Sequence, residues 1–333
     1  SSDLGFRHRS TESCVRSLFV GGPGRELIAS DYSAIEAVVT AMLAGEQWRI
    51  DAFMAGEDIY LASAARITGG SVEAYKAYAA ANGEHHPDRQ KIGKVAELGL
   101  GFGGWISAWR NFDSTDNFSD AQVKELILAW RDASPRIVEL WGGQWRGKPW
   151  DGYAERYGFE GAAVNAIQYP GHTFEHAGIA FFMRGDALIV RLLSGRELTY
   201  HEPRLEPSTR EYAAPGELSI TYSTWNSNAK YGAFGWVRMS TYGSRLTENI
   251  VQAIAHDILR YAILGLRAAG FAVVLHVYDE IVAEVPERPA TPPGVPDPQI
   301  AVFEAIMGRM APWCAGWPVR AAGGWRGKRY RKA

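Results

Sequence analysis

Hydrophobic positions along the chain follow two periods, one typical of strands and one typical of helices. Residues 26–30 form a short apolar run, typical of a buried strand, that ends at Asp31. Residues 271–285 indicate two strands that turn at Tyr278-Asp279-Glu280, and Ser194-Gly195 separates the two runs of a predicted hairpin. Helical spacing predicts helices over residues 33–43, 58–66, 72–81, 90–103, 120–132, 247–266 and 299–310. Strands interrupted by helical insertions predict an α+β fold.

Length and composition are those of an ordinary globular protein. The chain has 333 residues, 47% hydrophobic and 22% charged, which favours two lobes or one large domain. No apolar run approaches the roughly 20 residues of a membrane-spanning helix, and no signal peptide opens the chain. The cysteines, Cys14 and Cys314, have neither pairing nor metal-ligand spacing, so we interpret them as reduced thiols in a cytoplasm.

The charge gives no overall sign of nucleic-acid binding. The formal net charge is −2, so any DNA-binding surface must be local. The clearest basic cluster is the C-terminal tail, which taken alone is interpreted as a solvated chain end. It contains Arg326, Lys328, Arg329, Arg331 and Lys332, with Trp325 and Tyr330 between them. The start, polar and without methionine, is typical of a cut or tagged piece of a longer chain.

Carboxylates stand at the ends of two apolar strands. Asp31 leaves the first strand, with Glu36 one turn into the following helix, and Asp279 and Glu280 lie at the tip of the later hairpin. Either site alone is typical of an ordinary turn. Both strands are too apolar to be edges, so they can lie side by side and bring Asp31 close to Asp279. Paired carboxylates repel unless a cation lies between them, and oxygen ligands favour magnesium.

The segment RQKIGKVAELGLGFGG, residues 89–104, combines a helical apolar face with five glycines. Each interior glycine costs up to about 1 kcal/mol relative to alanine, so a helix here must gain from close approach or mobility. On an ideal wheel Lys91, Lys94, Leu98 and Phe102 share one face, which suits a ligand with phosphates at one end and a planar base at the other. The alternative is a glycine-rich loop with scattered lysines.

Three ordered motifs resemble motifs A, B and C of the family A DNA polymerases, and more closely those of the phage branch. They are DYSAIE, GKVAELGLGFGG and VYDE, and further matches include GEDIYLASA, LLSGRELTY, YGSRLTENIVQAIAHDIL and GWRGKRY. The resemblance covers the chain from about Cys14 to the end. It implies a right-hand polymerase fold: an antiparallel palm sheet from residues 1–60 and 241–333, and mainly helical fingers from residues 61–240. It also implies that the thumb and the exonuclease are absent, so the chain is trimmed or a separate chain supplies them.

The resemblance also assigns roles by position. Asp31 and Asp279 match the metal-binding aspartates, the Tyr32 carbonyl matches a backbone ligand, and Glu280 matches the second acid of motif C. Glu36 matches the steric gate against a ribose 2′-hydroxyl. The matching nucleotide-binding positions are Tyr60, Lys94, Leu98 and Phe102. The polar set that contacts primer and template is matched by Arg245, Asn249 and Gln252.

Several positions depart from the family pattern. Tyr278 replaces the histidine that usually precedes the motif C aspartate, and Val38 stands where many relatives have arginine. An arginine usually lies four residues before the motif B lysine, where this chain has Gln90. On an α-helical wheel Arg89 points well away from Lys94, so Lys91 is the expected substitute unless the helix starts later.

The paired carboxylates, the lysine-bearing helix and the resemblance together predict template-directed DNA synthesis with two magnesium ions. The expected partners are deoxynucleoside triphosphates (dNTPs) and primer-template DNA. The resemblance implies a phage or prophage gene that is expressed in a bacterial host. One alternative is an impaired primer-template-binding module that needs a partner chain. The other is a two-metal nuclease, which has no need for a lysine-bearing glycine-rich helix. No membrane association is expected.

Overall fold

The computed structural model describes residues 15–113, 117–142, 158–208, 218–227, 232, 234–289, 292 and 295–331, so Cys14 and Lys332 lie outside the described residues. Packing divides the chain into two compact units. The first unit is Ser1–Ile35 with Ala255–Ala333, and the second unit is Glu36–Ile254. The palm and fingers boundaries expected at residues 60 and 240 stay predictions, because compactness by itself does not define those subdomains.

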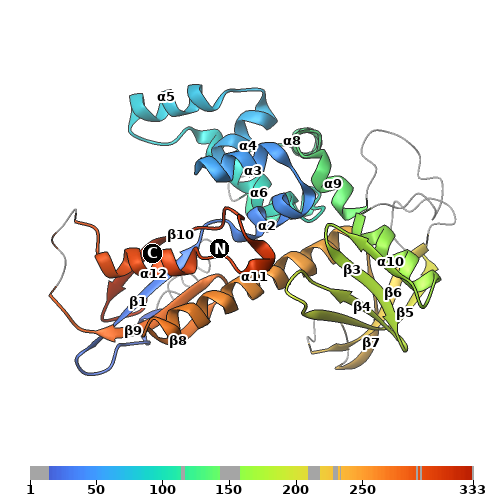
Figure 1. The fold of residues 1–333 in the computed structure, drawn as a ribbon. Coiled ribbons are helices and arrows are strands. Elements are labelled where there is room, and N and C mark those ends of the chain that lie inside the picture. Colours follow the sequence, from blue (N-terminus) through green and yellow to red (C-terminus); the bar gives the residue numbers. More distant parts are fainter. Residues whose placement is uncertain are drawn as a thin grey trace. The chain divides into compact units, whose positions relative to one another are not determined.

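A four-stranded antiparallel sheet forms the core of the first unit (Figure 1). Its order is β10-β1-β9-β8, from β1 (Arg25–Tyr32), β8 (Ala272–Val277), β9 (Glu280–Pro286) and β10 (Ala321–Gly327). The two most buried strands, β1 and β9, are central and adjacent, as expected for the strands that carry Asp31 and Glu280, whereas the equally apolar β8 lies at an edge. Helix α12 (Pro298–Met307) packs on β1 and β10, and the part of α11 (Gly243–Ala268) in this unit approaches α12 at Gly265.

The basic tail is part of this sheet. Trp325 and Tyr330 are 5% and 2% exposed, with ring centroids 5.9 Å apart. The Arg326 Nε lies 2.6 Å from a Glu26 carboxylate oxygen, and Lys328 Nζ donates to two backbone carbonyls. The interpretation of the tail as a solvated end is therefore wrong for its described part, since the aromatic residues provide a buried anchor.

Some helices of the second unit begin at residues whose side chains cap them. Asp58 accepts from the amides of Tyr60 and Leu61, and Ser119 forms a capping box with Gln122. The helices are α2 (Ile35–Ala44, which begins in the first unit), α3 (Gln47–Ala55), α4 (Ile59–Thr68), α5 (Val72–Asn82), α7 (Ile106–Phe112), α8 (Asp120–Ala133), α9 (Pro135–Trp141) and α10 (Gly158–Gln168).

The glycine-rich segment folds as two different helical pieces. Residues Arg89–Lys94 form a π-helical turn, η1, and Val95–Leu100 form the α-helix α6. The expected helix over 90–103 is therefore confirmed as helical backbone through Leu100, against the alternative of a loop, but its first part is π-helical and its last three residues are not helical. Its C-terminal end stops early because glycines follow, with Gly103 at φ 75°.

A six-stranded antiparallel sheet occupies the later part of the second unit, with α10 against one face (Figure 1). Its strands, in order, are β2 (Thr173–His176), β3 (Ile179–Arg184), β4 (Ala187–Arg191), β5 (Glu197–Pro207), β6 (Leu218–Asn226) and β7 (Gly235–Thr241). The hairpin predicted at Ser194-Gly195 is confirmed between β4 and β5.

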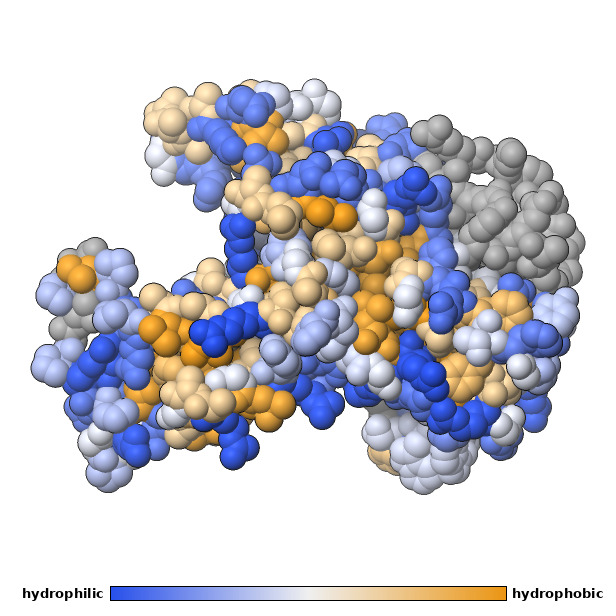
Figure 2. All heavy atoms as spheres, viewed as in Figure 1, coloured by the Kyte–Doolittle hydropathy of each residue, from blue (hydrophilic) through white to orange (hydrophobic). Residues whose placement is uncertain are grey.

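Within the described residues, no helix has the length and apolar character needed to cross a membrane. Hydrophilic and hydrophobic residues are mixed over the face that Figure 2 shows.

Candidate functional site

The carboxylates of β1 and the β8–β9 hairpin are brought together in the first unit. Asp31 pairs across the sheet with Glu280, and the Tyr32 amide donates to the Asp279 carbonyl oxygen at 3.2 Å. Both aspartates are half-buried at neighbouring strand ends. The predicted adjacency of the two motifs is therefore confirmed at the level of the backbone.

The hairpin tip that carries Asp279 is strained. Strands β8 and β9 are joined by two residues, and Tyr278 has φ 53°, a conformation that a bulky side chain rarely adopts. Its side chain is 92% exposed. Left-handed non-glycine residues cost of order 1–3 kcal/mol and are found at functional sites, where the surrounding structure holds them.

A β-bulge lies opposite Asp31. Ala29 pairs with Trp325 but Asp31 pairs with Ala322, so β10 contributes one extra residue there. A side chain at Gly324 would meet Cγ2 of Ile300 at 2.4 Å, so α12 approaches the bulge closely.

Glu304 of α12 connects the two strands at this bulge. Its Oε1 accepts from the Ser30 hydroxyl at 3.0 Å and from the Gly324 amide at 2.8 Å. Ser30 also lies 3.2 Å from the Ala322 carbonyl. Sequence reasoning missed Glu304, which fixes the backbone immediately before Asp31.

Glu280 is held within the unit. Its side chain accepts from the Tyr330 hydroxyl at 2.5 Å, and Arg16 Nη1 lies 3.7 Å away. Burial, followed by the Glu280 carboxylate, raises the pKa of Tyr330 to about 12, so the phenol stays protonated and keeps donating. The structure thus gives Glu280 a bracing contact with the C-terminal segment.

The Tyr32 side chain is an anchor for its own backbone. It is 2% exposed, and its hydroxyl donates to the Met307 carbonyl at 2.9 Å. Burial raises the pKa of this hydroxyl. The anchored side chain holds Tyr32 at the end of β1, next to Asp31.

The donor set at these strand ends fits a hard divalent cation. Asp31 and Asp279 supply carboxylates, and Tyr32 supplies a backbone carbonyl at the same edge. Among the described residues, no group of three or more His, Cys, Asp or Glu side chains is placed to hold a metal ion, so protein ligands at this edge are limited to the two aspartates and the backbone carbonyl. Oxygen ligands of this kind suit magnesium, which keeps some of its water and needs few protein ligands.

The π-turn η1 changes which basic residues face together. In a π-helix the hydrogen bonds run from i to i+5, so residues five apart align as residues four apart do in an α-helix. Arg89 and Lys94 are the first and last residues of η1. The α-helical wheel that separated Arg89 from Lys94 is therefore wrong here, and the one-residue displacement of the arginine is compensated.

Arg89 is also held beside another predicted nucleotide-binding residue. Its Nε lies 2.5 Å from Asp58 Oδ2, and its guanidinium carbon is 5.3 Å from the centroid of the Tyr60 ring. Gly93 makes the approach possible, because a Cβ there would lie 1.8 Å from the Tyr60 carbonyl oxygen. Lys91 is exposed, and Lys94 is half-buried.

The α6 helix is fixed by a buried ion pair. Arg49 and Glu97 have side chains 1% and 4% exposed, and Nη1 and Oε2 are 2.6 Å apart. Trp130 Nε1 donates to the other Glu97 oxygen at 3.1 Å, and Ser134 accepts from Arg49. A single loss in this network leaves a buried charge without its partner, which is strongly destabilising.

The glycine turn after α6 is held through its carbonyl groups. Trp141 Nε1 donates to Gly101 at 3.1 Å, and Arg131 Nη2 donates to Gly104 at 3.2 Å. Burial lowers the pKa of Arg131, whose guanidinium carbon is 4.9 Å from the Trp105 ring centroid. Sequence reasoning missed these two donors, because neither follows a spacing pattern.

The remaining predicted residues of the second unit differ in how far their side chains are exposed to solvent. Leu98 is 46% exposed, Phe102 is half-buried, and Glu36 is exposed in the first turn of α2. Val38 is 1% exposed, so a core residue fills the position where many relatives have arginine.

Three polar residues of α11 share one helix face. Arg245, Asn249 and Gln252 are spaced at i, i+4 and i+7, and Arg245 and Gln252 are exposed. Asn249 Nδ2 donates to the Tyr200 hydroxyl at 2.9 Å. The three side chains therefore lie on one face of the helix, and Asn249 is held by Tyr200 of β5.

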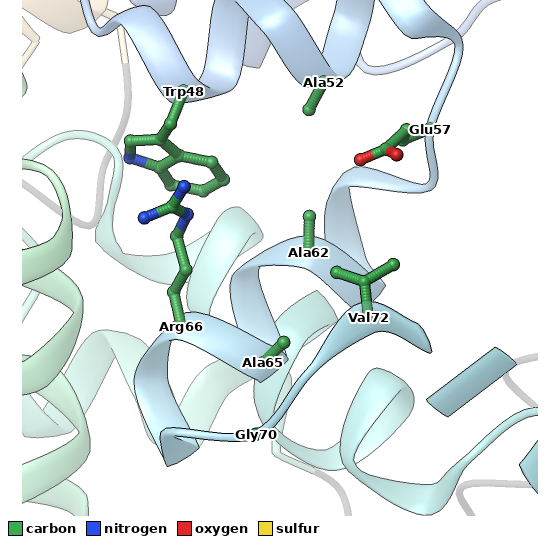
Figure 3. A pocket seen from close by; sticks show the side chains of 8 residues that line it. All are labelled: Trp48, Ala52, Glu57, Ala62, Ala65, Arg66, Gly70 and Val72. Carbon is green, nitrogen blue, oxygen red and sulfur yellow. The ribbon is translucent and has the colours of Figure 1, made fainter. Parts of the chain in front are cut away.

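A separate pocket of about 310 Å³ contains none of the predicted site residues. Figure 3 shows Arg66 reaching toward Trp48 on one side and Glu57 and Val72 on the other. The guanidinium carbons of Arg49 and Arg66 are each 4.4 Å from the Trp48 ring centroid. Two guanidinium groups therefore already lie against the indole that lines this pocket.

Known proteins give matches in sequence and in fold. No protein-family model matches the chain. The DNA polymerase of Bacillus phage SP02 is 36% identical over 310 residues, which are 93% of this chain and 42% of that protein. DNA polymerase I of Chloroflexus aurantiacus (strain ATCC 29366 / DSM 635 / J-10-fl) is 44% identical over 55 residues, 16% of this chain and 6% of that protein.

A solved structure, the POL domain of Pol1 from M. smegmatis in complex with DNA primer-template and dNTP, has a TM-score of 0.53 at 18% identity. The match covers 95% of this chain and 42% of that chain. The fold is therefore the α+β polymerase fold that the motifs predict. The chain is similar to a phage DNA polymerase over 93% of its own length, and it spans about two fifths of the length of that relative.

Proposed function

We propose that the chain carries out template-directed DNA synthesis, adding dNTPs to a primer 3′-hydroxyl. The observation that carries this proposal is the hydrogen bond from the Tyr32 amide to the Asp279 carbonyl, which holds two carboxylate-bearing strand ends together. The similarity to a phage DNA polymerase over 93% of the chain supports the same reaction.

Asp31, Asp279 and the Tyr32 carbonyl would hold two magnesium ions. Bound there, the ions would make the primer hydroxyl a better nucleophile and offset charge on the departing pyrophosphate. The bulge held by Glu304 keeps Asp31 at a fixed position, and the Tyr330–Glu280 contact braces the neighbouring strand. Preorganised ligands of this kind avoid rearrangement during the reaction.

The second unit would bind the nucleotide and the DNA. Lys94 and Arg89 would contact the triphosphate beside Tyr60, and Leu98 and Phe102 would flank the base. Glu36 would crowd a ribose 2′-hydroxyl and so select deoxynucleotides. The exposed face of α11, with Arg245, Asn249 and Gln252, would contact primer and template. We leave Lys91 out of this set, because η1 aligns Arg89 rather than Lys91 with Lys94.

A primer-extension assay tests the proposal. Purified chain, a labelled primer-template, dNTPs and Mg²⁺ should give products longer than the primer, and Asp279→Asn should give none. Products shorter than the primer, formed without dNTPs, would identify a nuclease instead. Primer-template binding without extension would identify the binding module, and adding host extract would then test for the partner chain. We place this activity in the bacterial cytoplasm because a phage protein is a relative.

A further inference from the structure

Two exposed tryptophans form a cluster on the six-stranded sheet, apart from the residues proposed for catalysis. Trp225 of β6 and Trp236 of β7 are direct cross-strand partners and are 58% and 64% exposed. Their ring centroids are 6.1 Å apart at 85°, and His201 lies 5.9 Å from Trp236 at 90°. Exposed aromatic clusters of this kind mark binding surfaces. We call these three residues the tryptophan cluster.

The cluster lies on the face of the sheet opposite α10. Phe181 is fully buried and its ring centroid is 5.7 Å from that of Phe159 in α10. Side chains alternate along a strand, so Phe182 points to the other face. The pairing of Phe182 with Ile189, and of Ile189 with Thr199, extends that face across the sheet.

The same alternation assigns the rest of the face. His201 follows Thr199 by two residues and pairs with Ser223, which in turn precedes Trp225 by two residues. The tryptophan cluster therefore shares one face with Phe182, and the sheet separates it from α10.

Basic and hydroxyl side chains lie between the aromatic rings. Arg238 donates to Thr221 Oγ1 at 3.0 Å and to Ser223 Oγ at 3.4 Å, which spreads its guanidinium over the face. The guanidinium carbon of Arg191 is 4.8 Å from the Phe182 ring centroid. Register and contacts place four arginines and four glutamates on this face: Arg184, Arg191, Arg204, Arg238, Glu175, Glu197, Glu202 and Glu206. The charges cancel, 4 − 4, and Glu197 pairs with Arg184 and Arg191 while Glu202 pairs with Arg238. Ion pairs between exposed side chains contribute little, so these guanidinium groups can exchange them for phosphates.

We propose that this face binds single-stranded DNA, with bases stacked on Trp225 and Trp236 and the arginines facing the phosphates. Aromatic platforms with interleaved arginine bind single strands with little sequence preference, because every base has a stacking face. A protein partner would favour an apolar surface centre depleted of charge. Here arginine and hydroxyl groups directly adjoin the rings, so nucleic acid is the better match. The proposal does not depend on the catalytic assignment.

Fluorescence anisotropy with a labelled 20-nucleotide oligo(dT) tests the proposal without nucleotides or metal. The full chain should bind, and Trp225→Ala with Trp236→Ala should weaken binding about tenfold or more. Replacement of both residues by phenylalanine should restore most of the affinity, whereas replacement by leucine should not, because leucine is apolar but cannot stack. Tyr261→Ala, which removes an aromatic residue 42% exposed on α11, is the matched control.

Equal affinity for the double alanine variant and the wild type would overturn the proposal, as would absence of oligo(dT) binding by the wild-type chain. Concentration-dependent self-association that the alanine variant abolishes and oligo(dT) does not displace would assign the face to a second copy. Leucine and phenylalanine variants of equal affinity would assign it to apolar docking. Thermal melts of each variant should match the wild type, since both tryptophans are more than half exposed.

Discussion

The Tyr32 amide and the Asp279 carbonyl oxygen, 3.2 Å apart, join residues 247 positions apart, 279 − 32, at one end of the first unit's sheet. This hydrogen bond continues the β1–β9 pairing into the hairpin turn, beyond Asp31 opposite Glu280. The strained Tyr278 precedes Asp279 in that turn. The positions of both aspartates are thus set by the backbone, before any ligand is considered.

The first prediction concerns these aspartates. Asp31→Asn and Asp279→Asn should each lower the rate of primer extension by at least about 100-fold, because a bound metal contributes several kcal/mol to such a transfer. Removing Mg²⁺ with excess EDTA should abolish extension by the wild type. Single-turnover extension with a labelled primer measures both effects.

The control for this prediction is the melting temperature of each asparagine variant. In EDTA each asparagine variant should melt within a few degrees of the wild type or slightly above it, because it loses the repulsion between two carboxylates. Wild-type extension rates from both variants would contradict the metal site. If a variant lost both extension and its folded structure, it could not test the metal site. The dependence of the wild-type extension rate on Mg²⁺ concentration would then decide whether the reaction needs the metal.

The second prediction concerns the sugar. Glu36 is exposed in the first turn of α2, five residues after Asp31 in the chain. Glu36→Ala should raise ribonucleotide use relative to deoxynucleotide use, with some loss of overall rate. Competing incorporation of a labelled ribonucleotide and deoxynucleotide gives the ratio directly. An unchanged ratio would show that discrimination comes from elsewhere in the pocket.

The third prediction separates Arg89 from Lys91. Arg89→Ala should raise the KM for dNTP about tenfold or more, since a charge-assisted bond to phosphate is worth about 1.5–3 kcal/mol. Lys91→Ala should change it less than about twofold, because η1 aligns Arg89, not Lys91, with Lys94. Steady-state extension kinetics at varied dNTP measure this difference.

The control is Asp58, which holds Arg89 and also caps α4. Asp58→Asn leaves Arg89 free to reach a phosphate but weakens the cap of α4. It should therefore lower the melting temperature more than it raises the KM for dNTP. If Asp58→Asn reproduced the KM effect of Arg89→Ala, the arginine would be structural. A large effect of Lys91→Ala alone would restore the α-helical interpretation.

The sequence was informative where a feature is local or repeats along the chain. The apolar runs of β1 and β9 predicted two central strands, and helical spacing predicted α11. The π-turn was not predictable from periodicity, because one extra residue in a glycine-rich turn leaves the apolar pattern nearly unchanged. Glu304 was missed because its partner Ser30 lies 274 residues earlier, and neither residue has a distinctive spacing.

The fourth prediction concerns Glu304 as a positioning residue for Asp31. Glu304→Ala should raise the Mg²⁺ concentration for half-maximal extension about fivefold, because losing one such hydrogen bond costs about 1 kcal/mol. Glu304→Gln keeps an acceptor oxygen and should restore the wild-type Mg²⁺ dependence. Extension rates over a Mg²⁺ series measure the effect. A lower melting temperature with an unchanged Mg²⁺ dependence would restrict Glu304 to a structural role.

The fifth prediction concerns the contact between η1 and α4. A Cβ at Gly93 would lie 1.8 Å from the Tyr60 carbonyl oxygen and 2.8 Å from its carbon, so Gly93→Ala must push two backbones apart. We expect a loss of about 2 kcal/mol or more in the free energy of unfolding, together with a raised KM for dNTP, because Tyr60 and Arg89 move with these elements.

Gly101→Ala is the matched control: the nearest atom to its Cβ is the Glu97 carbonyl oxygen at 3.9 Å, and Gly101 has an α-helical φ of −55°. That variant should be neutral or more stable, since alanine favours helix over glycine by up to about 1 kcal/mol. Urea unfolding and extension kinetics on both variants measure the contrast, and equal stability of the two would show that α4 and η1 are not in close contact.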